Sequence, residues 1–93
     1  MQIRNLSFAD LADYLKHGRE IEFAYNGRQY SITNHSEFWY LSDDTDHILL
    51  DTLSRFEEKE LLVSRIAVFT INGLTIQEIF DQKLYSEDSL DIL

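Results

Sequence analysis

Apolar residues recur at helical spacing near the start of the chain. Ser7, followed three residues later by Asp10, resembles a capping box, and His17-Gly18 provides a favourable last turn and a stop. Between these signals, one apolar stripe falls at positions i, i+3, i+4 and i+7, formed by Phe8, Leu11, Ala12 and Leu15. The pattern predicts a helix over residues 8–17.

Two segments in which apolar and polar residues alternate follow. They cover residues 20–25 and 28–33 and are separated by Asn26-Gly27, the preferred pair for a two-residue type I′ turn. The sequence therefore predicts an antiparallel hairpin with one apolar and one polar face. The turn sets four cross-strand pairs: Phe23–Tyr30, Ile21–Ile32, Glu22–Ser31 and Ala24–Gln29.

An aromatic strand is expected next. Residues 34–36 have the composition of a turn, and residues 37–42 form a third strand in which Trp39 must point away from Phe38 and Tyr40. One of these two sets is therefore buried, and the other leaves aromatic surface on the outer face of the sheet.

The segment after this strand is less distinctive. Residues 43–46 form an acidic loop. The apolar run at residues 47–53 is too short for periodicity to separate a strand from a buried helical turn. We favour a fourth strand.

Two helices are predicted in the second half of the chain. The first begins at a capping box of Ser54 and Glu57 and ends near Ala67, and the second begins at Thr75 with Glu78. The second helix ends near Lys83 and buries an apolar face. Between the helices lie a strand-like segment and a turn, residues 68–71 and Asn72-Gly73.

These elements predict one α+β domain over residues 1–93. It has an N-terminal helix, an antiparallel meander of three to four strands and two C-terminal helices. Residues 84–93 show no periodicity and are predicted to be a loose acidic tail.

Two segments of the sequence resemble a group of small uncharacterised bacterial proteins, many of them encoded near mobile elements. The first runs from Gly18 to Ile32 as GREIEF-x-YNG-x-x-YSI, and the second from Ile71 to Phe80 as I-x-G-x-T-I-x-E-I-F. The shared residues belong to the predicted hairpin, turn and last helix. The resemblance therefore supports the fold and implies no catalytic residue.

Motifs for catalysis and cofactor binding are missing from the sequence. The absence of cysteine excludes disulfides, thiolate metal sites and cysteine nucleophiles, and no glycine-rich phosphate loop or nucleophile elbow occurs. We expect no cofactor and no metal. The cluster of Asp43, Asp44, Asp46 and His47 suits a hard cation by composition, but it lacks the central glycine of a calcium loop, and a solvated turn is the favoured interpretation.

Charge is distributed unevenly along the chain. Residues 1–33 carry four basic and four acidic residues, whereas residues 34–93 carry four basic and thirteen acidic ones and so hold the whole net charge of −9. This balance disfavours direct binding to nucleic acids or anionic membranes. The chain lacks cysteine, and residues 1–6 lack the apolar stretch of a secretion signal, so we expect a cytoplasmic protein.

The sequence favours a non-catalytic protein-interaction module whose partner is unidentified. If the partner binds the acidic half of the chain, we expect that partner to be basic. A homodimer could use the same surface. One alternative is an acidic nucleic-acid mimic that inhibits a DNA- or RNA-binding protein, and a second is a small metal-binding protein or enzyme. The interaction residues under this hypothesis are Tyr25, Tyr30, Phe38, Trp39, Tyr40, Asp43, Asp44 and Asp46.

Overall fold

The computed structural model describes residues 5–93; residues 1–4, on which part of the expectation about a secretion signal depends, lie outside the described range. Within the described range, three α-helices and one 3-10 helix combine with a large and a small sheet. The elements in chain order are α1 (Phe8–Lys16), β1 (Ile21–Tyr25), β2 (Arg28–His35), β3 (Phe38–Asp43), β4 (Ile48–Arg55), α2 (Lys59–Val68), β5 (Thr70–Ile71), β6 (Leu74–Thr75), α3 (Ile76–Asp81), η1 (Glu87–Ser89) and β7 (Asp91–Ile92).

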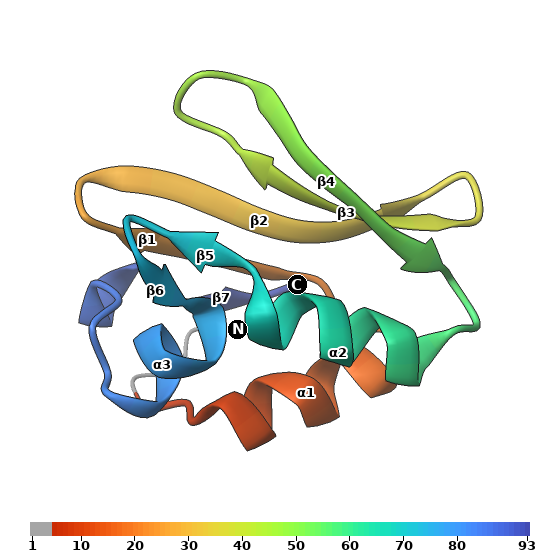
Figure 1. The fold of residues 1–93 in the computed structure, drawn as a ribbon, viewed down its shortest axis with the longest axis horizontal. Coiled ribbons are helices and arrows are strands. Elements are labelled where there is room, and N and C mark those ends of the chain that lie inside the picture. Colours follow the sequence, from red (N-terminus) through yellow and green to blue (C-terminus); the bar gives the residue numbers. More distant parts are fainter. Residues whose placement is uncertain (1–4) are drawn as a thin grey trace.

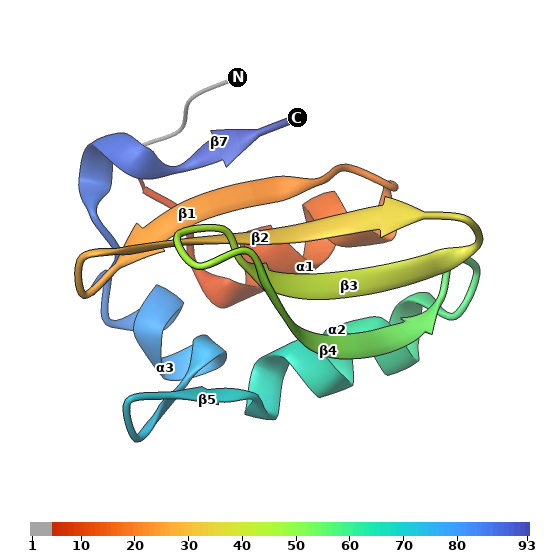
Figure 2. The same ribbon diagram turned by 90° about the horizontal axis from the view of Figure 1, so that it is seen from above.

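The large sheet is antiparallel and has the strand order β4-β3-β2-β1-β7. All three α-helices lie on the same side of it (Figure 1). Figure 2 looks onto the opposite side, where no helix of residues 5–93 covers the strands. The fold is thus α+β, as predicted, but the large sheet has five strands instead of the predicted three to four. Among residues 5–93, no helix covers its second face.

The β1–β2 hairpin confirms the predicted register. Phe23 pairs with Tyr30 and Ile21 with Ile32. Asn26 and Gly27 have φ values of 53° and 78°, the left-handed conformation that both central residues of a type I′ turn require. The apolar face of this hairpin points into the core.

Helix caps at two predicted positions are also confirmed. The side chains of Ser7 and Thr75 accept hydrogen bonds from the backbone N–H groups of Asp10 and Glu78, and both reciprocal bonds of each capping box are present. Helix α3 ends at Asp81, two residues before the predicted end. Its buried residues are Ile76, Ile79 and Phe80, as expected.

The expected capping box of Ser54 and Glu57 is wrong. Ser54 belongs to β4 and its hydroxyl donates to the carbonyl of Arg55, because β4 extends beyond its predicted end. Helix α2 therefore begins later, at Lys59, and the backbone N–H of Arg55 donates to the Glu58 carboxylate at 2.9 Å. The favoured strand over residues 47–53 is confirmed as part of β4.

Two breaks in register shape β3 and β4. The turn between β2 and β3 lies at Ser36 and Glu37, both at positive φ, and not at residues 34–36. Along β4, Leu50 and Leu53 have no Cα partner in β3, because the register shifts at each of them. These two bulges turn extra leucines toward the core, where Leu53 is fully buried.

The prediction of a loose tail at residues 84–93 is wrong. Ile92 pairs with Ile21, which adds β7 to the sheet, and the hydroxyl of buried Tyr85 accepts from the backbone N–H of Leu6 at 2.8 Å. The Ser89 hydroxyl accepts from the backbone N–H of Ala24. Isolated apolar residues, too few to produce a period, hold this segment in place.

Candidate functional site

The predicted interaction residues divide between the core and the surface. Trp39 is fully buried and Tyr30 is 4% exposed, so neither offers a binding surface. Tyr25 lies half-buried against the core. The alternation left open by the sequence is therefore decided: Trp39 points to the helices, and Phe38 and Tyr40 lie on the outer face, both partly exposed.

A residue outside the predicted set covers Trp39. The Phe56 ring stacks on the Trp39 ring at a centroid distance of 5.7 Å, and the Phe56 carbonyl accepts from the indole N–H at 3.2 Å. Lys59 caps the stack, with its ammonium 3.7 Å from the centroid of the Phe56 ring. The indole N–H therefore finds its hydrogen-bond acceptor inside the protein.

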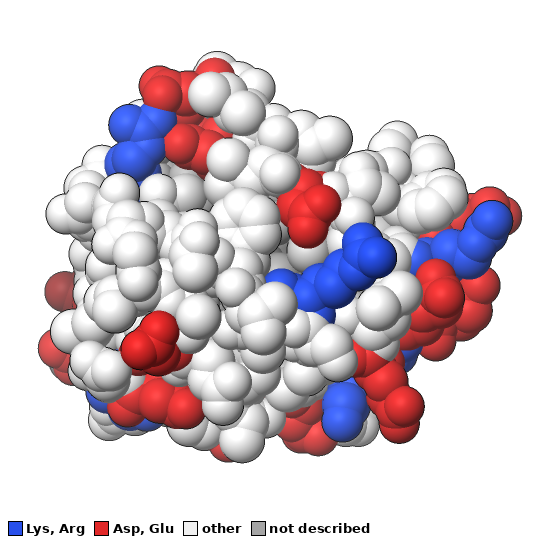
Figure 3. Space-filling view, in the orientation of Figure 1, with Lys and Arg blue, Asp and Glu red and all other residues white. Residues whose placement is uncertain are grey.

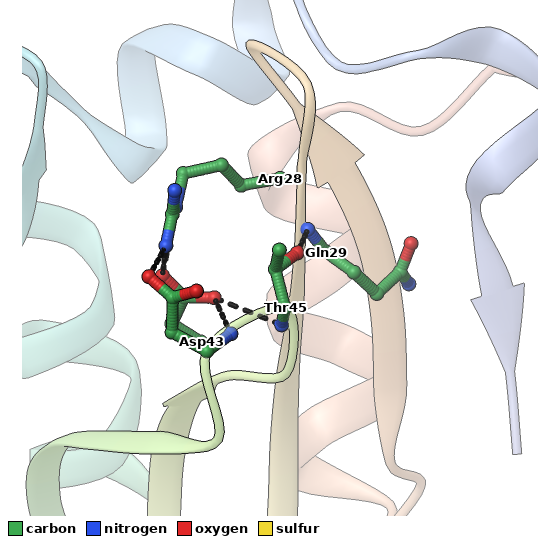
Figure 4. A network of polar contacts seen from close by, with 5 residues as sticks. Arg28, Gln29, Asp43 and Thr45 are labelled. Atoms are coloured by element: carbon green, nitrogen blue, oxygen red, sulfur yellow. Dashed lines mark hydrogen bonds and ion pairs between the residues drawn. The ribbon is translucent and has the colours of Figure 1, made fainter.

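The acidic loop forms a closed polar network with the start of β2 (Figure 4). The guanidinium of Arg28 donates to Asp43 at 2.9 Å and also contacts Asp46. The other carboxylate oxygen of Asp43 accepts from the backbone N–H groups of Thr45 and Asp46, and the Thr45 hydroxyl accepts from the backbone N–H of Gln29. The network fastens the β3–β4 loop to β2.

The electrostatics of Asp43 follow from this network. Burial alone would raise its pKa, but the hydrogen bonds from Arg28 and from the backbone of Asp46 and Thr45 outweigh burial and hold the pKa below its ordinary value. The buried carboxylate is therefore charged and fully occupied by donors. Asp43 therefore fixes the β3–β4 turn from a buried position, in contrast to the solvated turn that the sequence favours.

The proposed cation cluster is not assembled. Asp43 and Asp46 face Arg28, and Asp44 accepts from the Ser31 hydroxyl at 3.1 Å. Within residues 5–93, no three His, Asp or Glu side chains are grouped so that they could hold a metal ion. His17 lies at the C-cap of α1, where its Nδ1 is 2.8 Å from the carbonyl of Asp13.

The helix-free face of the sheet combines aromatic and acidic side chains. The register places Tyr40 beside Thr52 and Phe38 beside Arg55, whose guanidinium lies 5.4 Å from the centre of the Phe38 ring. The neighbouring position toward the β3–β4 loop pairs Ser42 with Leu49, which is 56% exposed. This part of the face carries two partly exposed aromatic rings and an exposed leucine among polar neighbours, and no helix of residues 5–93 covers it.

The acidic part of the same face lies over β1. Glu22 pairs with Asp91 of β7, and Asp44 reaches this region through its bond to Ser31. Partial burial, together with the charges of Asp44, Asp91 and Glu20, raises the pKa of Glu22. The carboxylate of Glu22 is thus repelled by its acidic neighbours.

A groove was not anticipated from the sequence. It has a volume of about 260 Å³ and follows the free edge of β4, between that strand and α2. Figure 3 shows basic atoms beside uncharged surface in this region, with acidic atoms nearby. The lining consists of Phe38, Thr52, Leu53, Ser54, Arg55, Glu58, Leu61 and Arg65. The spacing of Glu58, Leu61 and Arg65 on one helical face was the available signal.

No family model matches the chain, and no curated protein or solved structure matches it significantly. In the part of the chain that the structure describes, no helix has the length and apolar character needed to cross a membrane.

Proposed function

We propose that the chain is a non-catalytic protein-interaction module that binds its partner through the helix-free face of the sheet. The observation that carries this proposal is an apolar strip on that face, formed by the partly exposed rings of Phe38 and Tyr40 and the exposed side chain of Leu49. Aromatic side chains on an uncovered surface gain free energy when a partner buries them. We assign the module to the cytoplasm, since a chain without cysteine suits a reducing compartment.

The acidic half of the face supports a partner with basic residues. Glu22 lies on the same face as the apolar strip and is repelled by nearby carboxylates, so lysine or arginine on the partner would relieve that repulsion. Apolar contact would supply affinity, and charge would supply orientation and a faster encounter.

Retention of a partner from the native cytoplasm tests the proposal. Tyr40→Ser and Leu49→Ser should abolish specific retention on the immobilised protein. Val68→Ser is the matched control, because Val68 is an apolar residue of α2 that is 70% exposed. Retention that survives both outer-face substitutions, or that Val68→Ser removes equally, would contradict this surface assignment.

A nucleic-acid mimic is the second candidate function. The neighbouring carboxylates of Glu22 and Asp44 favour it, since they could occupy a basic groove in place of phosphates. Binding of that kind should weaken steeply between low and physiological salt, whereas binding through the apolar strip should change little. Salt-insensitive association with the recovered partner would exclude the mimic.

A further inference from the structure

The groove along β4 is basic although the whole protein is acidic. Arg55 and Arg65 line it, and neither forms an ion pair with another of residues 5–93. The one acidic residue of the lining, Glu58, uses a carboxylate oxygen to accept from the backbone N–H of Arg55. Two guanidinium groups are therefore free to bind carboxylates in a protein with a net charge of −9.

The shape of the groove suits side chains of a polypeptide. Its volume of about 260 Å³ is below the usual size of pockets that enclose a whole cofactor or drug-sized ligand, and it is open to solvent. Its apolar surface includes Leu61, which is 38% exposed, and Phe38. An apolar side chain can rest there while neighbouring carboxylates reach the arginines.

The position of the groove also favours an extended segment. β4 is an edge strand, so one side of its backbone lacks a neighbouring strand in the described sheet. Edge strands commonly accept an added strand from a partner. The bulges at Leu50 and Leu53 interrupt regular pairing, and side-chain contacts must therefore carry much of the recognition.

Arg55 is held in a suitable orientation. Its guanidinium lies over the Phe38 ring, so its planar group is ordered while its N–H donors can point outward. Arg65 projects from the facing helix at the same groove. Together they form a clamp for carboxylates that are separated along an extended chain.

We propose that this groove binds an extended, acidic and apolar segment of a partner protein. The carboxylates meet Arg55 and Arg65, and an apolar side chain contacts Phe38 and Leu61. The inference deepens the proposed function and rests on it, since it adds a second contact of the same module and states the chemistry of the segment that the module recognises.

Selection from a display library of random nine-residue peptides on the immobilised full chain tests the inference. We expect enriched peptides to carry Asp or Glu next to apolar residues. Binding of an enriched peptide, measured by fluorescence anisotropy, should weaken by about tenfold or more in the double variant Arg55→Gln and Arg65→Gln. Replacement of the peptide's acids by amides should produce a similar loss.

A second double variant controls for net charge. The double variant Lys16→Gln and Lys83→Gln also removes two positive charges, but from exposed positions outside the groove. It should leave the affinity for the peptide unchanged. Thermal melts verify that both proteins are folded. Failure to enrich any peptide, enrichment of basic peptides, or equal losses in the two double variants would overturn the groove assignment. If Tyr40→Ser and Leu49→Ser still abolish partner retention in that case, the proposed function stands without it.

Discussion

The β1–β2 and β3–β4 hairpins belong to one sheet but are closed in different ways. Asn26 and Gly27 make a tight turn, and the strands on either side pair without interruption. The β3–β4 loop is longer, its strands shift register twice, and its position depends on Arg28 from the other hairpin. The closure of the β1–β2 hairpin is thus specified by adjacent residues, whereas that of the β3–β4 hairpin depends on contacts between residues distant in the sequence.

This difference between the hairpins accounts for the positions of the candidate binding face and the groove. The regular hairpin supplies the flat, well-paired centre of the sheet, whereas the bulged hairpin carries Leu49 on the outer face and the groove at its free edge. Bulges commonly redirect side chains at sheet edges. The candidate binding surfaces therefore belong mainly to the less regular hairpin.

The largest change in stability is expected for Leu53→Ala, which tests the bulge at Leu53. Leu53→Ala removes a fully buried side chain and should lower the free energy of unfolding by about 2–5 kcal/mol. Leu49→Ala on the same strand is the control and should change it by no more than about 0.5 kcal/mol, since Leu49 is 56% exposed. Urea denaturation measures both. Equal losses would mean that the bulge does not separate the two leucines as described.

The next largest change in stability is expected for Gly27→Val, which tests the tight turn at Asn26-Gly27. Gly27→Val forces a β-branched residue into a φ of 78°, which should cost on the order of 1–3 kcal/mol. An added Cβ would meet no atom within 4 Å, so backbone strain is the only expected cause. Gly27→Asn should be much milder, because asparagine tolerates this conformation. If the Gly27→Val and Gly27→Asn variants have the same melting temperature, the turn is not the type I′ turn described.

Sequence reasoning succeeded where neighbouring residues determine the structure. The Asn26-Gly27 turn and the caps at Ser7 and Thr75 are such cases, because their partners lie within a few residues. The turn at Ser36 and Glu37 has the same left-handed φ values without glycine, so its position could not be predicted from composition.

Long-range contacts account for most of what was missed. Tyr85 is buried against the backbone of Leu6, 79 positions away in the sequence, and no local pattern indicates this. The same holds for the candidate binding surfaces: alternation separated Trp39 from Phe38 but could not say which one the helices cover. The groove depends on the relative placement of β4 and α2.

The contact between the two hairpins has its own pH dependence. Asp43→Asn retains an oxygen that can accept from the backbone of Thr45 and Asp46 but loses the charge that faces Arg28. Because the folded-state pKa of Asp43 is lowered from 3.8, the carboxylate stabilises the fold above that value and loses its effect as the pH falls through the folded-state pKa.

Melting temperatures of this variant and the parent between pH 7 and pH 2 measure the effect. The variant should melt a few degrees lower at neutral pH, and the gap should close in acid. Glu57→Gln is the control, since Glu57 is exposed and lies outside the network. A gap that is unchanged across the pH range would show that charge pairing with Arg28 contributes nothing.

The smallest effect concerns the outer face, where the β3–β4 loop approaches β1. Partial burial and the charges of Asp44, Asp91 and Glu20 raise the pKa of Glu22 above its ordinary value of 4.5. At a pH above 4.5, the ionised carboxylate therefore lowers the stability of the fold. That cost disappears as the pH falls through the raised folded-state pKa. Glu22→Gln should therefore stabilise the protein at neutral pH, by no more than about 0.5 kcal/mol.

Both acid and added salt should reduce the advantage of Glu22→Gln, because they neutralise or screen the same repulsion. Glu60→Gln, at an exposed position on α2, should show no comparable gain. Combining Glu22→Gln with Asp44→Asn should give less than the sum of the two single effects, because each substitution removes the same pairwise repulsion. Strict additivity would mean that the loop does not bring Asp44 close to β1, and the acidic half of the proposed binding face would then have to be reassigned.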